Sequence, residues 1–260
     1  MEQAQIREHL FTAEIQSAAQ QLAAISDKPL KNLVVLGSGL VGALDEWGLP
    51  EITGKLSDFT GVLAPVADGH LDRFAVFGNT LVTYGRTHLY EGHGPDAVTV
   101  FPKIAAAAGI NRAVLCNANG CLRDWNLGDV MLISDHANFT AISPFSGPVF
   151  TDIWTTWSSR LREAAQPYVQ RVGTYGILRG PEFQTQLESN ILRNAGIDCV
   201  GMSTVMEALT LHALEVEVAG LSVVSDLSFD DVPTDPTLVV ETAAKANTTL
   251  RKAIEAILAV

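Results

Sequence analysis

The segment Asn32-Leu-Val-Val-Leu-Gly-Ser-Gly-Leu-Val-Gly42 indicates the fold class of this chain. Its first residues are mostly apolar and include adjacent valines, which is typical of a buried strand. At Gly37 the run enters a glycine-rich turn with the spacing G-x-G-x-x-G. A buried strand that leads into such a turn fits an α/β fold, and the rest of the chain supports that class.

Three interpretations of the glycine turn stay open on this segment alone. The first is the dinucleotide-binding loop of an NAD-dependent oxidoreductase, which also requires an acidic residue about 20 positions further on, at the end of a second strand. Asp58 lies in that range, but the residues around it do not follow an apolar strand. The second is a tight turn that needs small residues. The third is a loop that binds one phosphate through its amides and the Ser38 hydroxyl.

Apolar runs alternate with helical patterns along the remainder of the chain. This alternation predicts an α/β fold, and the absence of a linker or repeat predicts one domain over residues 1–260. The last helix is expected to start at an Asp235 cap with Pro236 in its first position and to run to the C-terminus. The other predicted helices cover 3–25, 97–108, 158–170, 186–195 and 204–214, and the predicted strands cover 73–77, 81–84, 113–116, 130–134, 175–178 and 218–225.

Composition excludes several classes of protein. The 260 residues are 47% hydrophobic and 18% charged, which is globular rather than disordered. A net charge of −12 argues against a nucleic-acid surface, and it requires any phosphate site to be built from local cations and N–H groups. We expect no membrane span and no signal segment, because no apolar run is long enough to span a membrane and the N-terminus has no apolar core. The three cysteines form neither a disulfide framework nor a zinc pattern, so we expect a cytoplasmic protein.

A second polar segment runs from Tyr84 to His93. If the preceding strand continues past Gly85, Arg86, His88 and Tyr90 share one face, because side chains alternate along a strand. A guanidinium suits bidentate phosphate binding, and an imidazole can bond the same anion. A solvated loop is the alternative interpretation, and three aligned polar groups make it less favourable than the anion site.

Two further segments carry candidate binding groups. Cys116–Cys121 follows a strand and reads as a β-turn, although its small residues also let backbone amides approach a ligand. Gly180–Thr185 precedes Val200–Glu207, in which Ser203 or Thr204 either caps the following helix or helps to hold an anion at its N-terminus.

Together these segments resemble the trimeric purine nucleoside phosphorylases. The resemblance rests on LGSGL, GRTHLYEGH, CNANGCL, GPEFQT and GMSTVMEAL in unchanged order, between about Leu33 and Asp226. It implies one α/β domain with a central mixed, partly barrel-like sheet surrounded by helices. It also implies phosphorolysis of purine nucleosides to a free base and a (deoxy)ribose 1-phosphate, with phosphate as co-substrate, no cofactor or metal, and a homotrimer. The glycine turn then becomes a phosphate loop.

The resemblance assigns expected roles to individual residues. The phosphate site is expected at Ser38, His70, Arg86, His88, Ser203 and the backbone amide of Ala118. Tyr90 and Met202 would line the ribose, and Phe183, Gln184 and Asp226 would bind the base. An aromatic from the neighbouring subunit closes the pocket in this family, and Phe150, ahead of Phe145, is the expected equivalent.

Three departures from the family pattern leave the substrate open. Gln184 and Asp226 stand where members that act on 6-oxopurines have glutamate and asparagine, and methylthioadenosine phosphorylases also have aspartate at the second position. No histidine for the ribose 5′-hydroxyl occurs in residues 227–233, and Asn119 and Cys121 replace smaller residues. A methylthioadenosine- or adenosine-type phosphorylase is therefore the alternative, and a nucleoside-binding protein without turnover is a more remote one.

Overall fold

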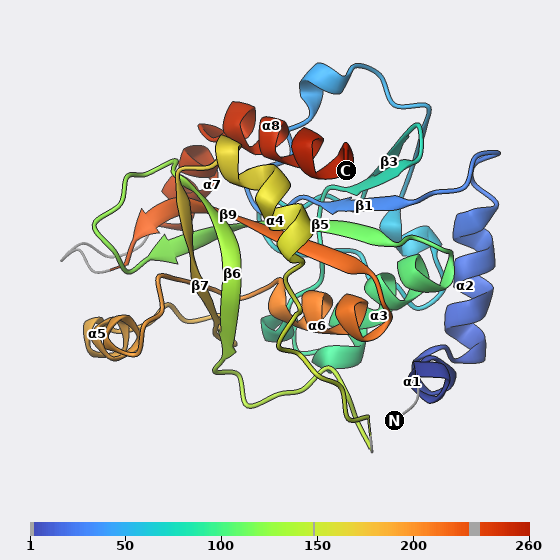
Figure 1. Ribbon diagram of the computed structural model, residues 1–260, viewed down its shortest axis with the longest axis horizontal. Helices are drawn as coiled ribbons and strands as arrows, with labels where there is room; N and C mark the ends of the chain where they lie inside the picture. Colours follow the sequence, from blue (N-terminus) through green and yellow to red (C-terminus); the bar gives the residue numbers. More distant parts are fainter. Residues whose placement is uncertain (1–2, 148, 229–234) are drawn as a thin grey trace.

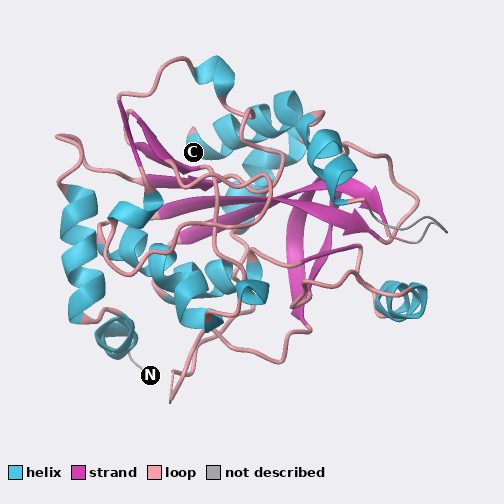
Figure 2. Ribbon diagram, turned by 180° about the vertical axis from the view of Figure 1, so that it is seen from behind, coloured by secondary structure: helices cyan, strands magenta, loops and turns pink. Residues whose placement is uncertain are grey.

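The computed structural model describes residues 3–147, 149–228 and 235–260. Its strands form one mixed sheet in the order β2-β3-β4-β1-β5-β8-β7-β6-β9, flanked by helices (Figures 1 and 2). The strands are β1 (Asn32–Val35), β2 (Ile52–Gly54), β3 (Phe74–Phe77), β4 (Thr80–Thr83), β5 (Arg112–Cys121), β6 (Val130–Asn138), β7 (Arg171–Ile177), β8 (Cys199–Gly201) and β9 (Glu217–Leu227). The α-helices are α1 (Gln3–Leu10), α2 (Ala13–Ala23), α3 (Gly94–Ala107), α4 (Ser159–Ala165), α5 (Gln186–Asn194), α6 (Val205–Ala213), α7 (Pro236–Ala244) and α8 (Asn247–Leu258).

One half of the sheet closes on itself. β9 pairs in parallel with β5 over almost the whole length of both strands, and it also pairs with β6 at the end of the sheet order. Strands β5, β8, β7, β6 and β9 therefore form a closed mixed barrel, from which β1, β4, β3 and β2 extend as an open sheet. This architecture confirms the predicted α/β class and the partly barrel-like sheet.

Two apolar clusters lie on the two faces of the sheet. Leu33 and Val35 of β1 pack into a cluster that includes residues of α2, α3 and α6. Val34, between them, packs into the other cluster, with residues of α4 and α8. Figure 1 shows α4 and α8 on one side of the strands and α3 and α6 on the other. The alternation of one short strand thus places helices on both faces.

Several predicted element boundaries are wrong. The helix predicted over 3–25 is two helices, because the Thr12 hydroxyl accepts the N–H of Ile15 and starts α2 anew. The helix predicted over 158–170 ends at Ala165, and a 3₁₀ turn containing Pro167 follows. Asp235 does cap α7, but tight bonds from Lys245 and Ala246 to carbonyls three residues back end that helix before α8 begins.

Two further predictions, both for candidate site segments, also differ from the structure. Cys116–Cys121 is not a turn, since β5 continues to Cys121. The strand before Arg86 does not continue past Gly85, because β4 ends at Thr83 and Leu89–Glu91 forms a 3₁₀ helix. Within the described ranges, no helix has the length and apolar character needed to cross a membrane.

Candidate active site

A cavity of about 410 Å³ opens where β1 ends beside β5. β5 pairs with β1 only as far as Leu115 and with β8 only from Gly120, so the residues between have a neighbouring strand on the β9 side alone. This opening in the sheet forms the cavity floor. Eleven predicted site residues line the cavity: Ser38, His70, Arg86, His88, Tyr90, Ala118, Phe183, Gln184, Met202, Ser203 and Asp226.

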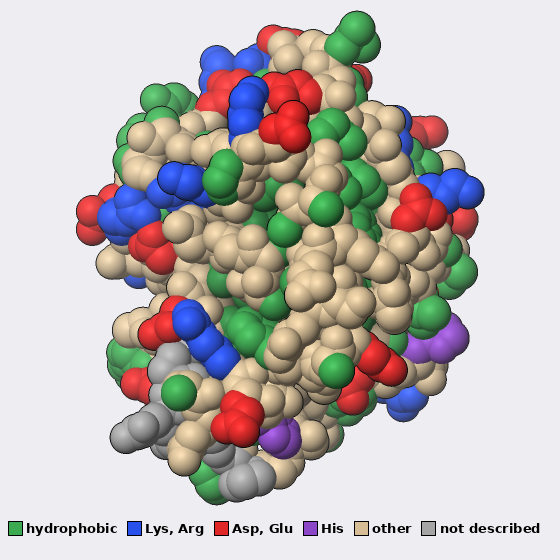
Figure 3. All heavy atoms as spheres, turned by 90° about the vertical axis from the view of Figure 1, so that its right-hand side faces the viewer, with side chains coloured by type: hydrophobic (Ala, Val, Ile, Leu, Met, Phe, Trp, Pro, Cys, Tyr) green, Lys and Arg blue, Asp and Glu red, His purple; other side chains and the backbone are tan. Residues whose placement is uncertain are grey.

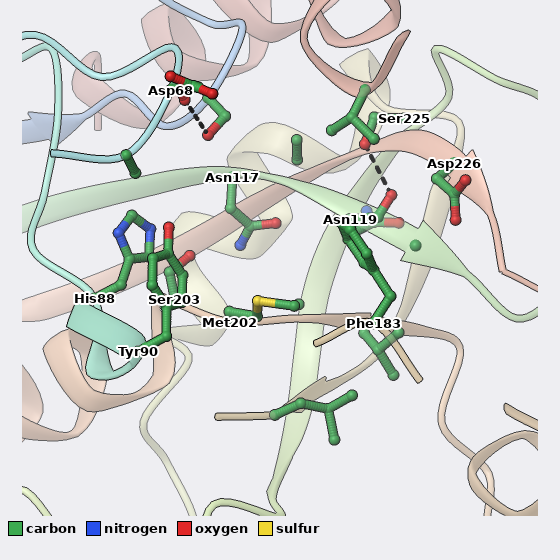
Figure 4. A pocket seen from close by; sticks show the side chains of 18 of the residues that line it. Asp68, His88, Tyr90, Asn117, Asn119, Phe183, Met202, Ser203, Ser225 and Asp226 are labelled. Carbon is green, nitrogen blue, oxygen red and sulfur yellow. Dashed lines mark hydrogen bonds between the residues drawn. The ribbon is translucent and has the colours of Figure 1, made fainter. Parts of the chain in front are cut away.

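The lining residues divide into two ends. Figure 4 shows His88, Tyr90 and Ser203 at one end, Phe183 and Asp226 at the other, and residues of β5 between them. The structure thus brings together all the residues expected to contact phosphate, ribose and base within this chain, although they come from distant segments.

The Arg86 guanidinium is buried and held by fixed partners. Its Nε lies 3.1 Å from a carboxylate oxygen of Glu207, and both side chains are less than 5% exposed. Nη1 donates to the carbonyl oxygen of Cys116 at 2.7 Å and to the Ser203 hydroxyl at 3.4 Å, and Nη2 donates to the carbonyl oxygen of Val35 at 3.4 Å. These contacts fix the guanidinium at the cavity, and Glu207 balances its charge.

His70 is a neutral imidazole with a defined tautomer. Its Nδ1 accepts the backbone N–H of Arg86 at 3.1 Å, so the ring proton is on Nε2, which lies 2.9 Å from the Ser38 hydroxyl. Burial, followed by the nearby His88 and Arg86, lowers the pKa of His70 to about 2. His70 thus offers a hydrogen-bond donor without a positive charge at neutral pH.

His88 faces the same end of the cavity. Its Nδ1 lies 3.2 Å from Glu91 Oε1, which also accepts the His88 backbone N–H at 2.7 Å. Burial lowers the pKa of His88 and outweighs the opposing effect of Glu91. The ring stacks on Tyr90 with centroids 4.7 Å apart and meets the His70 ring edge-on. The bent backbone after β4, rather than a straight strand, brings these side chains to one cavity.

The base end depends on a β-bulge. Asn119 pairs with Val224, but the next pair is Gly120 with Asp226, so Ser225 is the extra residue. The Ser225 hydroxyl donates to the backbone carbonyl of Asn119 at 2.9 Å, as Figure 4 shows. The bulge brings Asp226 to the cavity wall.

Sequence reasoning missed several lining residues. Ser228 donates its hydroxyl to Asp226 Oδ2 at 2.8 Å, and a spacing of two residues along an extended segment was a signal that could have indicated it. Asn117 lies in the segment Cys116–Cys121, whose pattern predicted no role for its side chain. Val239 and Val240 of α7 also line the cavity, and no local pattern connects that helix to the site.

Four other expectations meet the structure as follows. Phe150 and Phe145 are not among the cavity's lining residues; Phe150 is 78% exposed, whereas Phe145 packs against the chain's own core.

Asp58 accepts the backbone N–H of Lys55 in its own turn, and the Gly37 loop leads into turns rather than a helix, which removes the dinucleotide interpretation. Residues 229–233 of the segment without a histidine lie outside the described residues. Within the described ranges, no group of three or more His, Cys, Asp or Glu side chains could hold a metal ion.

Comparisons with known proteins show which proteins this chain is similar to. The family model described as "Phosphorylase superfamily" matches residues 39–259. The purine nucleoside phosphorylase of Mycobacterium tuberculosis is 40% identical over 202 residues, covering 75% of each chain. Purine nucleoside phosphorylase 1 of Geobacillus stearothermophilus is 31% identical over 245 residues, covering 86% of this chain and 89% of that protein. The crystal structure of Schistosoma mansoni purine nucleoside phosphorylase in complex with adenosine has a TM-score of 0.84 at 24% identity, covering 94% of this chain and 95% of that one, and so shares the fold.

Proposed function

This chain belongs to the phosphorylase superfamily, and from that membership we propose that it is a purine nucleoside phosphorylase. It cleaves the N-glycosidic bond of purine (deoxy)ribonucleosides with inorganic phosphate and releases the free base and (deoxy)ribose 1-phosphate. One observation carries this proposal: a single cavity has anion-binding groups at one end and Gln184 with Asp226 at the other. No cofactor other than phosphate as co-substrate is required.

The anion end is suited to a phosphate dianion. The Arg86 guanidinium is fixed in place. Neutral His70 supplies an N–H group and Ser38 supplies a hydroxyl. Ser203 lies just before the N-terminus of α6. Because the protein as a whole is acidic, these local groups must overcome long-range repulsion of the anion. His88 and the Ala118 backbone amide complete the proposed phosphate site, and Tyr90 and Met202 the ribose site.

The arrangement favours bond cleavage through a ribosyl cation. Phosphate held at the Arg86 end stabilises positive charge that develops at C1′ and then captures that carbon. Hydrogen bonding at the base end stabilises the departing purine, and it strengthens as charge accumulates on the base. Fixed placement of both partners supplies much of the remaining rate.

A second substrate class is favoured by the contact between Ser228 and Asp226. The Ser228 hydroxyl donates to Asp226 Oδ2 at 2.8 Å, which helps to fix the orientation of this carboxyl group at the base end. An ionised carboxylate accepts from a 6-amino group and repels a 6-oxo group. Gln184, unlike glutamate, can donate to the unprotonated N1 of adenine. Adenosine and methylthioadenosine are therefore the alternative substrates to inosine and guanosine.

Release of base from these four nucleosides, measured with and without phosphate, tests both levels. Phosphate-dependent release from any of them supports phosphorolysis. Activity confined to inosine and guanosine would remove the aminopurine alternative. Release from none would refute the enzyme assignment and leave a nucleoside-binding protein without turnover. As a specificity control, Asp226→Asn should lower the ratio of kcat/KM for adenosine to that for inosine about tenfold, the effect of one base hydrogen bond.

Oligomeric state and location complete the proposal. We propose a homotrimer in which Phe150 of one protomer closes the pocket of its neighbour. The high exposure of Phe150 supports this role, and Phe145, which is partly buried against the core of its own chain, is less suited to it. We also propose a cytoplasmic protein without nucleic-acid or membrane partners, which agrees with its three free cysteines.

A further inference from the structure

Thr204 occupies a strained backbone conformation beside the anion end of the cavity. Its φ of 77° and ψ of −49° lie in the region of the rare form of the γ-turn, and the N–H of Val205 donates to the carbonyl oxygen of Ser203 at 2.9 Å, as that turn requires. Among the described residues other than glycine, Ala141 and Glu215 also have positive φ, but only Thr204 is β-branched. A β-branched residue in this region is disfavoured, so the surrounding structure must hold it there.

The turn determines where two functional elements point. Ser203 precedes the strained residue and lines the cavity, while α6 starts directly after it at Val205. Arg86 Nη1 donates to the Ser203 hydroxyl on the same side. A relaxed Thr204 would rotate the Ser203 hydroxyl and the first amides of α6 relative to Arg86.

A chain of buried polar side chains holds Thr204. Asn117 Nδ2 of β5 donates to Thr204 Oγ1 at 2.8 Å, and the Thr204 N–H donates to Glu207 Oε2 at 3.2 Å. Asn117 Oδ1 accepts from the Ser222 hydroxyl of β9, which in turn accepts from Asn119 Nδ2 at 2.7 Å.

Burial fixes which group donates and which accepts in each hydrogen bond of this series. Asn117, Ser222, Asn119 and Thr204 are each no more than 3% exposed, so water cannot replace their partners. Because the Ser222 hydroxyl donates to Asn117 Oδ1, the Asn117 NH₂ group is left to face Thr204. Two strands of the barrel thereby determine the position of one hydroxyl at the start of α6.

We propose that Asn117 is a positioning residue for phosphate: it holds Thr204 in the γ-turn and so keeps Ser203 and the first amides of α6 directed at the anion. This rests on the proposed function, since phosphate is the anion of that reaction. Asn117 lines the cavity but acts through Thr204, because its Nδ2 donates to Thr204 and its Oδ1 accepts from Ser222.

A double-mutant cycle with Thr204→Gly tests the proposal. Glycine adopts positive φ without strain, so the turn no longer needs to be held. Asn117→Ala alone should raise the KM for phosphate about tenfold, the equivalent of one lost hydrogen bond, while the nucleoside KM changes less than about twofold. In the Thr204→Gly background the same substitution should change the phosphate KM less than about twofold. Ser222→Ala, which removes only the support behind Asn117, should shift it in the same direction by a smaller factor and serves if Asn117→Ala fails to fold.

Asn32→Ala is the matched control. Asn32 is a buried asparagine at the start of β1 that bonds to Asn79 and Thr80, away from the cavity. Its replacement should lower stability and leave both KM values unchanged. Equal effects of Asn117→Ala in both backgrounds, or equal rises in both KM values, would overturn the positioning role.

Calorimetric titration of the native protein and the variants with inorganic phosphate separates this proposal from the proposed function. Phosphate binding that weakens in Asn117→Ala but not in the Thr204→Gly background supports the role even if no nucleoside is cleaved. Undetectable phosphate binding to the native protein would overturn it.

Discussion

Arg86 and Glu207 form an ion pair that is almost fully withdrawn from water. Removing one member leaves the other as an uncompensated buried charge, which typically costs about 3–5 kcal/mol. We therefore expect Arg86→Ala to lower the free energy of unfolding by about this amount, measured by urea denaturation.

The same pair allows stability and phosphate affinity to be separated. The double variant Arg86→Gln with Glu207→Gln leaves two neutral amides that can bond to each other, and it should recover much of the lost stability. Phosphate affinity should stay weak because the cation is absent. A double variant that binds phosphate as tightly as the native protein would contradict the role assigned to Arg86.

The neutral state of His70 predicts a pH dependence of stability. Its pKa is about 2 in the folded protein and about 6.5 in the unfolded chain. Below pH 6.5 the unfolded chain binds a proton that the folded chain excludes, so the free energy of unfolding falls as the pH is lowered. The slope reaches about 1.4 kcal/mol per pH unit for each such histidine, and the lowered pKa of His88 acts in the same direction.

Urea midpoints between pH 7.5 and 5 measure this slope. His70→Gln should flatten the profile, because glutamine does not titrate. An unchanged profile in that variant would show that His70 is protonated in the folded protein.

At the scale of elements, the end of the parallel β5–β9 pairing, after the bulge, needs glycine at position 120. A Cβ there would clash with the Ser228 hydroxyl oxygen and lie 3.5 Å from Asp226 Oδ2. Gly120→Ala should therefore displace Ser228 and Asp226 and raise the nucleoside KM about tenfold or more, with a smaller change in the phosphate KM.

Removing the clashing atom provides the control for that prediction. Gly120→Ala combined with Ser228→Ala eliminates the shortest contact and should recover part of the lost nucleoside affinity. If the second substitution recovers none, the damage lies in the β5–β9 pairing rather than at the base end.

At the scale of the whole molecule, the exposed Phe150 predicts assembly. In the proposed trimer, Phe150→Ala should raise the nucleoside KM several-fold and leave the phosphate KM unchanged, because the ring would cover the base end of a neighbouring site. Sedimentation equilibrium measures the mass of the assembly, and for the native protein this mass should be three times that of one chain. A monomer with full activity would contradict this arrangement.

The surface charge of the whole molecule contrasts with its site. On the face shown in Figure 3, most Lys and Arg side chains lie beside Asp and Glu side chains rather than in a continuous basic patch. The net charge of −12 makes the overall field repel anions. Phosphate binding therefore depends on the few groups inside the cavity.

Local sequence patterns predicted the helices and strands in which apolar residues repeat at a short, regular spacing. The apolar run at Asn32 indicated β1, and Asp235 with Pro236 indicated the start of α7. The predicted boundaries were wrong where a single residue interrupts a pattern, as Thr12 does between α1 and α2. Pattern periods average over several residues, so they do not detect such a break.

By itself, the sequence determined the fold class and most of the segments that meet at the cavity, α7 excepted, because periodicity and motif order are properties of the chain. Only the tertiary structure decided how the side chains act there. The pairing of Arg86 with Glu207, the neutral His70 and the strained Thr204 all depend on contacts between residues far apart in the chain. Burial raises the energetic cost of every unpaired polar group, and that cost selects partners which no local pattern can indicate.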